Sequence, residues 1–256
     1  MVLHVFLREM HPHLLTLGPV TIPTFGAVAA LGLVLATLLA ARGARVVHIS
    51  EDAVWNLCLF IAGSTLVLSR LLIVAQVPKA FLHYPLYILT LPTVTKYGLL
   101  AAVASALLYI LFKRLPLLRT ADALAPAILL LQATLHLGSL FAGDDLGSPT
   151  LLRIGQWVPG DRGYHPVALY SAVLTLLAFG ACYLFLQQGH PRGETFGLGL
   201  LLGALIRFFI DQFRPGYVLP ESFIGGDFLR VDQVVLILLA AAGLGFFFQR
   251  RRTYAQ

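Results

Sequence analysis

The sequence is poor in charged residues and contains only two cysteines. Charged side chains make up 12% of the 256 residues, whereas hydrophobic side chains make up 58%. This composition excludes an ordinary soluble domain, in which about a quarter of the residues are charged, and indicates an integral membrane protein. Cys58 and Cys182 lie within apolar stretches and show no metal-ligand or redox spacing, so we expect both to be core residues.

The patterns of several other protein classes are also missing. The N-terminus has no basic segment followed by a sustained apolar run and a small-residue cleavage site, so we expect no cleaved signal peptide. There is no internal repeat or nucleotide-binding loop, which argues against a repeat-built transporter or an ATP-driven pump. The basic residues flank apolar segments instead of clustering with aromatic residues, which argues against nucleic-acid binding. We expect no cofactor and no metal ion.

Apolar segments long enough to cross a bilayer, or nearly so, account for most of the chain. They cover residues 23–41, 53–75, 97–112, 121–142, 166–187, 194–213 and 231–249. We therefore predict an all-α, polytopic membrane helix bundle of about seven transmembrane helices, forming a single integral membrane domain over residues 1–256. Segment 78–95 contains three prolines and is too broken to span, so an interfacial or re-entrant helix near the outer surface is expected there.

The charges of the connecting segments predict the orientation of the bundle. One side carries an excess of basic residues, namely Arg42, Arg45, Lys113, Arg114, Arg119, Arg192, Arg250, Arg251 and Arg252. The positive-inside rule makes that side cytoplasmic and places the N-terminus outside and the C-terminus inside. The two long connections, residues 143–165 and 214–230, then lie outside, so we expect any chemistry at or just beneath the outer leaflet.

Charge inside the sixth apolar segment is the strongest single indication of a functional site. Arg207 and Asp211 are four residues apart and therefore lie on one helical face. Charged groups inside membrane segments are costly and usually face a cavity or a substrate path. The pair is a candidate functional site, and a structural ion pair that fixes helix packing is the alternative.

A series of short motifs follows in a definite order along the chain. Segment 136–149 stands in the place of the signature Arg-x-Gly-Asn-Phe-x-Asn-Gly-Glu-x-x-Gly, segment 165–170 is similar to His-Pro-x-x-Leu-Tyr, and segment 206–214 to Arg-Phe-x-x-Glu-x-x-Arg. With Pro19–Gly26 and Ser69-Arg70-Leu71, these motifs resemble the prolipoprotein diacylglyceryl transferase family over most of the chain.

The resemblance implies an activity, partners and a location. The reaction would transfer the diacylglyceryl group of phosphatidylglycerol to the lipobox cysteine in the signal peptide of a prolipoprotein, releasing glycerol 1-phosphate. The protein would work among membrane lipids as a multi-pass protein of the bacterial cytoplasmic (inner) membrane. Such a reaction needs cations where the phosphate leaves and a base or positive surroundings for the thiol.

The resemblance and this chemistry together select the candidate site residues. The catalytic candidates are Arg207, Asp211, His136, Asp144 and Lys96. The candidates for substrate binding are Arg70, Arg214, Ser139, Gly138, Gly147, His165 and Tyr170.

The chain departs from the family pattern at several of these positions. His136 and Ser139 replace an arginine and an asparagine, Asp144 replaces a glutamate, and Lys96 replaces the histidine of a His-Gly-Gly motif. In addition, Phe25 replaces a tyrosine and Ser171 a glutamate. His136 and Lys96 would compensate as donors to phosphate, and His136 also as a base near neutral pH.

Plain structural roles are the alternatives for single residues. His136 would also serve as a core histidine bonded to a neighbouring helix, while Lys96 and Arg70 would extend their charged ends to the membrane interface. At the level of function, two alternatives stay open. One is a non-catalytic member that binds phospholipid or a lipoprotein precursor, and the other is a transferase with a different lipid group or acceptor.

Overall fold

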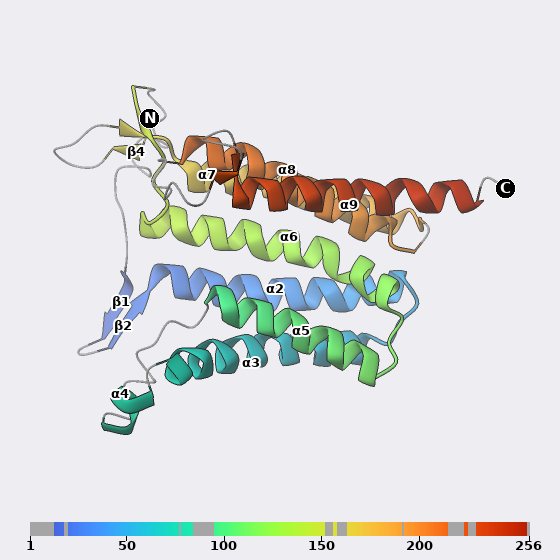
Figure 1. Cartoon of the computed structure of the whole chain (residues 1–256), viewed down its shortest axis with the longest axis horizontal. Helices are drawn as coiled ribbons and strands as arrows, with labels where there is room; N and C mark the ends of the chain where they lie inside the picture. Colours follow the sequence, from blue (N-terminus) through green and yellow to red (C-terminus); the bar gives the residue numbers. More distant parts are fainter. Residues whose placement is uncertain are drawn as a thin grey trace.

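The computed structural model describes residues 13–17, 20–76, 78–83, 95–151, 156–157, 163–190, 192–214, 223–224 and 229–254. Its long helices are α2 (Thr24–Val46), α3 (Glu51–Gln76), α5 (Lys96–Phe112), α6 (Leu117–Ala142), α7 (Val167–Gln187), α8 (Glu194–Ile210) and α9 (Val231–Tyr254). They run roughly along one common direction (Figure 1). The predicted all-α polytopic membrane bundle is confirmed.

Most of the predicted spans are long enough to cross a membrane. Six helices of the described chain are sufficiently long and apolar, with α8 continuing through the 3₁₀ turn η2 (Asp211–Phe213). The segment predicted at 97–112 forms a shorter apolar helix within α5. The predicted interfacial segment begins with the short helix α4 (Pro78–His83), and residues 84–94 of that prediction lie outside the described chain.

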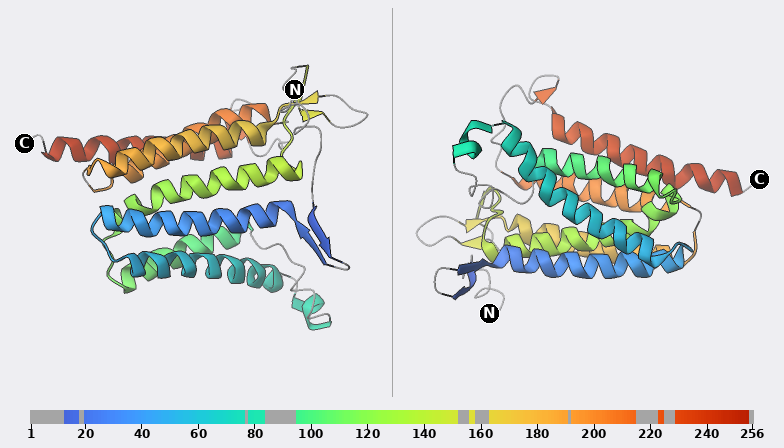
Figure 2. Two further views of the ribbon diagram at one scale, coloured as in Figure 1. Left: turned by 180° about the vertical axis from the view of Figure 1, so that it is seen from behind. Right: turned by 90° about the horizontal axis from the view of Figure 1, so that it is seen from below.

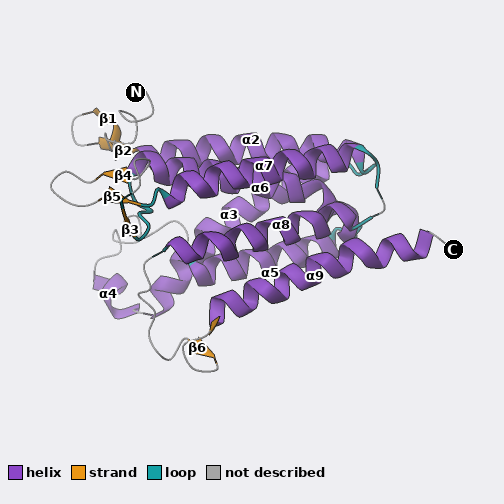
Figure 3. Ribbon diagram, turned by 90° about the horizontal axis from the view of Figure 1, so that it is seen from above, coloured by secondary structure: helices purple, strands orange, loops and turns teal. Residues whose placement is uncertain are grey.

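Short strands that the sequence did not predict gather near the end of the bundle where α2, α7 and α9 begin (Figures 1 and 3). β1 (His13–Leu17) and β2 (Val20–Pro23) form an antiparallel hairpin in which Leu15 lies opposite Ile22. β3 (Pro149–Thr150), β5 (Gly163–Tyr164) and β4 (Gln156–Trp157) form a small antiparallel sheet in that order, and β6 (Phe223–Ile224) pairs with β7 (Leu229–Arg230). Strands of two to five residues are too short to show an alternating apolar pattern in the sequence.

The helices pack through small side chains. The core between α2, α3 and α6 consists of Ala36, Ala40, Ala44 and Ala127 with Val54. Large side chains such as Leu111, Phe112, Leu177 and Leu238 instead lie on the outside of the bundle. This inverted arrangement suits a bilayer, where apolar surface is solvated by lipid and small residues allow close helix contact.

The helix pair α3–α5 lies on the opposite side of α2 from α7, α8 and α9 (Figure 2). Hydrogen bonds connect this helix pair at two positions along its length. The Thr95 backbone N–H donates to Ser69 Oγ at 3.2 Å, and the Gly98 N–H donates to Thr95 Oγ1 at 3.0 Å, capping α5. Further along, Ser105 Oγ donates to Ser64 Oγ at 3.2 Å. The α3–α5 pair is therefore held by interhelical hydrogen bonds as well as by apolar packing.

We expect Gly98→Ala to destabilise this helix pair. A Cβ atom at position 98 would lie 2.6 Å from Ser69 Cα and would also overlap Ser69 Oγ, so the backbones must separate. The expected cost is about 1–3 kcal/mol in the free energy of unfolding, as for other overpacked sites. Unfolding of the purified protein in detergent measures it.

Gly63→Ala in α3 is the matched control, because a Cβ there meets no atom within 4 Å. It is expected to be neutral or stabilising by up to about 1 kcal/mol, since alanine has the higher helix propensity. Equal stability of the two variants would contradict the close approach of α3 and α5.

Candidate functional site

Arg207 and Asp211 form the ion pair that their spacing predicts. Arg207 Nε donates to Asp211 Oδ2 at 3.1 Å across the junction of α8 and η2. Only 2% of the Asp211 side chain is exposed, whereas 48% of the Arg207 side chain is exposed. Within the described chain, the two terminal nitrogens of the Arg207 guanidinium have no hydrogen-bond acceptor, so they are available to a ligand.

Arg214 extends this pair into a chain of four charges. Its Nη1 donates to Asp211 Oδ1 at 3.0 Å, and its Nη2 donates to Asp145 Oδ2 at 2.7 Å. Asp145 belongs to the connection that follows α6, so the chain Asp145–Arg214–Asp211–Arg207 ties that connection to the end of α8. Two cations and two carboxylates balance each other, which reduces the cost of placing charge in a partly buried site.

Backbone hydrogen bonds hold the same connection in place. The Gly147 N–H donates to the His165 carbonyl at 2.9 Å, and the Ser148 N–H donates to the Phe213 carbonyl at 2.7 Å. A Cβ at Gly147 would lie 2.7 Å from the Phe213 oxygen and 2.6 Å from Val167 Cγ2, so only glycine fits there. Gly147, predicted to bind substrate, therefore has a packing role at this junction.

His165 and Tyr170 come together beside the same junction. His165 Nδ1 lies 3.5 Å from the Tyr170 hydroxyl, and its ring centroid lies 5.2 Å from that of Phe213. The Tyr170 and Phe213 rings also meet, edge to face, at 5.8 Å. The three rings form one aromatic cluster directly next to the residues of the ion chain.

The end of α6 places Gly138, Ser139 and Asp144. Gly138 faces Phe25 of α2, where a Cβ would lie 3.2 Å from Phe25 Cδ2. The Ser139 carbonyl accepts from Gly143 N–H at 2.9 Å and Asp144 N–H at 3.2 Å, and Gly143 ends the helix with a φ of 80°. These contacts let the chain turn out of α6 toward Asp145.

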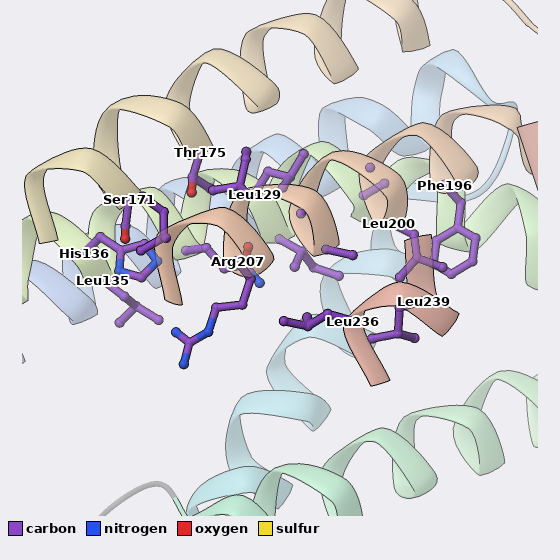
Figure 4. Close-up of a pocket in the computed structure, with 18 residues that line it drawn as sticks. Leu129, Leu135, His136, Ser171, Thr175, Phe196, Leu200, Arg207, Leu236 and Leu239 are labelled. Carbon is purple, nitrogen blue, oxygen red and sulfur yellow. The ribbon is translucent and has the colours of Figure 1, made fainter. Parts of the chain in front are cut away.

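A cavity of about 450 Å³ lies between α6, α7, α8 and α9 (Figure 4). Most of its wall is apolar, and its polar lining residues are Gln132, His136, Ser171, Thr175 and Arg207. His136 makes no hydrogen bond to another residue of the described chain, which does not support the alternative of a core histidine bonded to a neighbouring helix. Apolar pockets with a few convergent polar groups are typical ligand sites.

The structure thus brings some of the predicted site residues together and leaves others apart. Arg207 and His136 line the cavity, and Asp211 and Arg214 support Arg207. Arg70 belongs to α3 and does not line the cavity, and its buried Nε has no hydrogen-bond partner in the described chain. Lys96 begins α5, but its side chain lies outside the described structure.

Sequence reasoning missed four residues of the site. Ser171 was noted only as a departure from the family pattern, and Asp145, Gln132 and Thr175 were not included among the candidates. The spacing of Gln132 from His136, and of Ser171 from Thr175, is four residues and places each pair on one helical face. That spacing is the signal that would have found the polar wall of the cavity.

Fold and site together define a polytopic membrane protein with an apolar cavity of about 450 Å³ and an arginine in the wall of that cavity. A family model described as prolipoprotein diacylglyceryl transferase matches residues 12–249, and the chain belongs to this family. This confirms the resemblance.

Relatives named phosphatidylglycerol–prolipoprotein diacylglyceryl transferase match almost the whole chain. The protein of Trichormus variabilis is 26% identical over 262 residues, covering 94% of this chain and 91% of the relative. That of Bacillus cytotoxicus is 26% identical over 252 residues, covering 93% and 91%. That of Listeria monocytogenes is 24% identical over 264 residues, covering 95% and 91%.

We expect Asp145→Asn to lower the free energy of unfolding more than Asp144→Asn, although the resemblance predicts Asp144 in the place of the family glutamate. Asp145 pairs with Arg214, whereas the Asp144 side chain makes no ion pair within the described residues. With its side chain 24% exposed, Asp145 should contribute about 1 kcal/mol to the free energy of unfolding. Asp144→Asn should change it by less than about 0.5 kcal/mol. Parallel unfolding curves in detergent measure both, and equal effects would contradict the assignment of Asp145.

Proposed function

We propose that this protein transfers the diacylglyceryl group of phosphatidylglycerol to the lipobox cysteine of a prolipoprotein signal peptide. The observation that carries the proposal is the position of Arg207, a cation held by buried Asp211 in the wall of an apolar cavity. An anionic phospholipid needs both features, a positive group for its phosphate and an apolar space for its tail. The names of the relatives state the same donor and acceptor.

The chemistry assigns a different task to each group. The cysteine sulfur forms a bond to the terminal glyceryl carbon, the bond from that carbon to the phosphate oxygen breaks, and glycerol 1-phosphate leaves. Arg207 stabilises the negative charge that develops on the leaving phosphate. His136, in the same cavity wall, accepts the thiol proton.

Asp211 acts as a positioning residue for Arg207, and Arg214 with Asp145 holds Asp211 in turn. A guanidinium fixed before the substrate arrives stabilises charge without a reorganisation cost at the moment of reaction. Arg70 and Lys96, on the α3–α5 pair, are proposed as further cations for the lipid headgroup.

A non-catalytic protein that binds phospholipid or a lipoprotein precursor is the second candidate. The neutral ion chain and the replacement of the family arginine by His136 favour it, because less positive charge is available for a leaving phosphate. Saturable lipid binding without release of glycerol phosphate would identify this function.

The transfer assay tests the proposal directly. Purified protein is incubated with phosphatidylglycerol labelled in its acyl chains and a lipobox peptide, beside the same peptide with its cysteine changed to serine. Cysteine-dependent labelling with glycerol phosphate release is expected. No transfer by the folded protein, while the Bacillus cytotoxicus relative works in parallel, would contradict the enzyme function.

In the same assay, Arg207→Gln should lower the rate of transfer about 100- to 1,000-fold, as expected when a charge-stabilising donor is removed. Arg192→Gln is the matched control, because Arg192 is exposed at the opposite end of α8. It should leave the rate unchanged. If Arg207→Gln and the control have equal rates and both proteins are folded, a catalytic role for Arg207 is contradicted. The pair of Arg207 and Asp211 would then be a structural ion pair that fixes helix packing.

We also propose that the chain is one multi-pass domain of the bacterial inner membrane, with the N-terminus outside, the C-terminus inside and the ion chain near the outer surface. Leu151→Cys should then react with a membrane-impermeant maleimide on intact inner-membrane vesicles of native orientation, and Ser50→Cys only after permeabilisation. Both positions are exposed in the structure. Leu151 follows α6 and Ser50 follows α2, and these two helices end at opposite ends of the bundle (Figure 1). The reverse labelling pattern would contradict the orientation.

A further inference from the structure

We propose that the cavity selects donor lipids by the length of one acyl chain, and that Phe196 closes the end of the cavity where this chain stops. The cavity with Phe196 at its end is called the length gauge below. The inference rests on the proposed function, because it takes the donor to be a diacyl phospholipid. It goes further in assigning the two acyl chains different places and in naming a residue that determines specificity.

The cavity is long and follows one face of α8. Its wall includes Phe196, Leu200, Gly203, Arg207 and Ile210, which recur at helical spacing. The headgroup end lies at Arg207, and at about 1.5 Å per residue the distance along the helix from Phe196 to Arg207 is roughly 16 Å. An extended acyl chain of about myristoyl to palmitoyl length fills that distance.

The two ends of the cavity differ in chemistry. Figure 4 shows His136 beside Ser171 toward one end and Phe196 at the other, with Arg207 between them. The polar groups of Thr175 and Arg207 also lie away from the Phe196 end. An ester and a phosphate therefore match the end near His136, and a terminal methyl group matches the end near Phe196.

Contacts between α8 and α9 close the Phe196 end. The Phe196 ring meets the Phe246 ring edge to face at 5.8 Å. At the neighbouring position, a Cβ on Gly197 would lie 2.8 Å from the Gly243 oxygen, so the two backbones are in direct contact. A chain that reaches Phe196 therefore cannot continue past it between these helices.

The volume limits the number of chains. A cavity of about 450 Å³ is comparable to the volume of one palmitoyl chain and too small for two. The second acyl chain of the donor must then remain on the lipid-facing side of the bundle. The cavity therefore selects for the length of only one of the two acyl chains.

Two substitutions move the end of the gauge in opposite directions. Phe196→Ala removes the stop and should admit longer chains. Leu200→Phe places a larger side chain about one turn closer to Arg207 and should favour shorter chains. Phe209→Ala and Leu205→Phe make the same chemical changes at exposed positions of α8 that do not line the cavity, and they serve as matched controls.

The experiment compares transfer rates from phosphatidylglycerols with matched acyl chains, from lauroyl to arachidoyl, in the presence of the lipobox peptide. The unmodified protein should prefer chains near palmitoyl. Relative to palmitoyl, the rate with arachidoyl chains should rise about tenfold in Phe196→Ala, and that with lauroyl chains about tenfold in Leu200→Phe. Both control variants should keep the length profile of the unmodified protein.

Binding of the same lipids, measured by native mass spectrometry, separates failure of this inference from failure of the proposed function. Transfer with a length profile that neither variant changes would overturn the gauge and leave the transferase function standing. Absence of transfer, with lipid binding that still shifts in both variants, would overturn the transferase function and support the gauge. Transfer rates and binding that do not depend on acyl-chain length in the unmodified protein would also overturn the gauge. This outcome does not require the variants to fold.

Discussion

The buried carboxylate of Asp211 is the constraint on which the site depends. Its side chain is 2% exposed within a membrane-spanning helix, where an unpaired charge would be costly. Arg207 and Arg214 each bond one of its two oxygens, at 3.1 and 3.0 Å. Since Arg214 also bonds Asp145, the same carboxylate fixes both the cation beside the cavity and the connection that leaves α6.

The bilayer explains why a cavity forms beside these charges. Close contact between helices in lipid depends on small residues, and α8 meets α9 at Gly197 and Gly243. Further along α8, a Cβ at Gly203 would be in ordinary van der Waals contact with Leu129 of α6 at 3.7 Å, so α8 and α6 leave room for a methyl group there. The helix thus packs tightly at its first turn and leaves space where Arg207 and His136 lie.

The sequence predicted the helices and the central ion pair because both have strong local signals. Long apolar runs predict spans, and four-residue spacing places Arg207 and Asp211 on one face. Asp145 could not be chosen over Asp144 from sequence, because its role depends on Arg214, 69 residues further along the chain. The cavity could not be predicted from the sequence either, because it arises from the tilt and spacing of four helices. Arg70 and Lys96 were selected from the family resemblance and from the need for cations at the phosphate, and Arg70 does not line this cavity.

The central claim is that Arg207 and the cavity together hold one phospholipid. An electron cryomicroscopy structure of the protein in phosphatidylglycerol nanodiscs tests it most directly. The account predicts a lipid whose phosphate lies within hydrogen-bond distance of the Arg207 guanidinium and whose one acyl chain extends along α8 toward Phe196. A phosphate bound elsewhere, with no acyl chain between α6, α8 and α9, would contradict it.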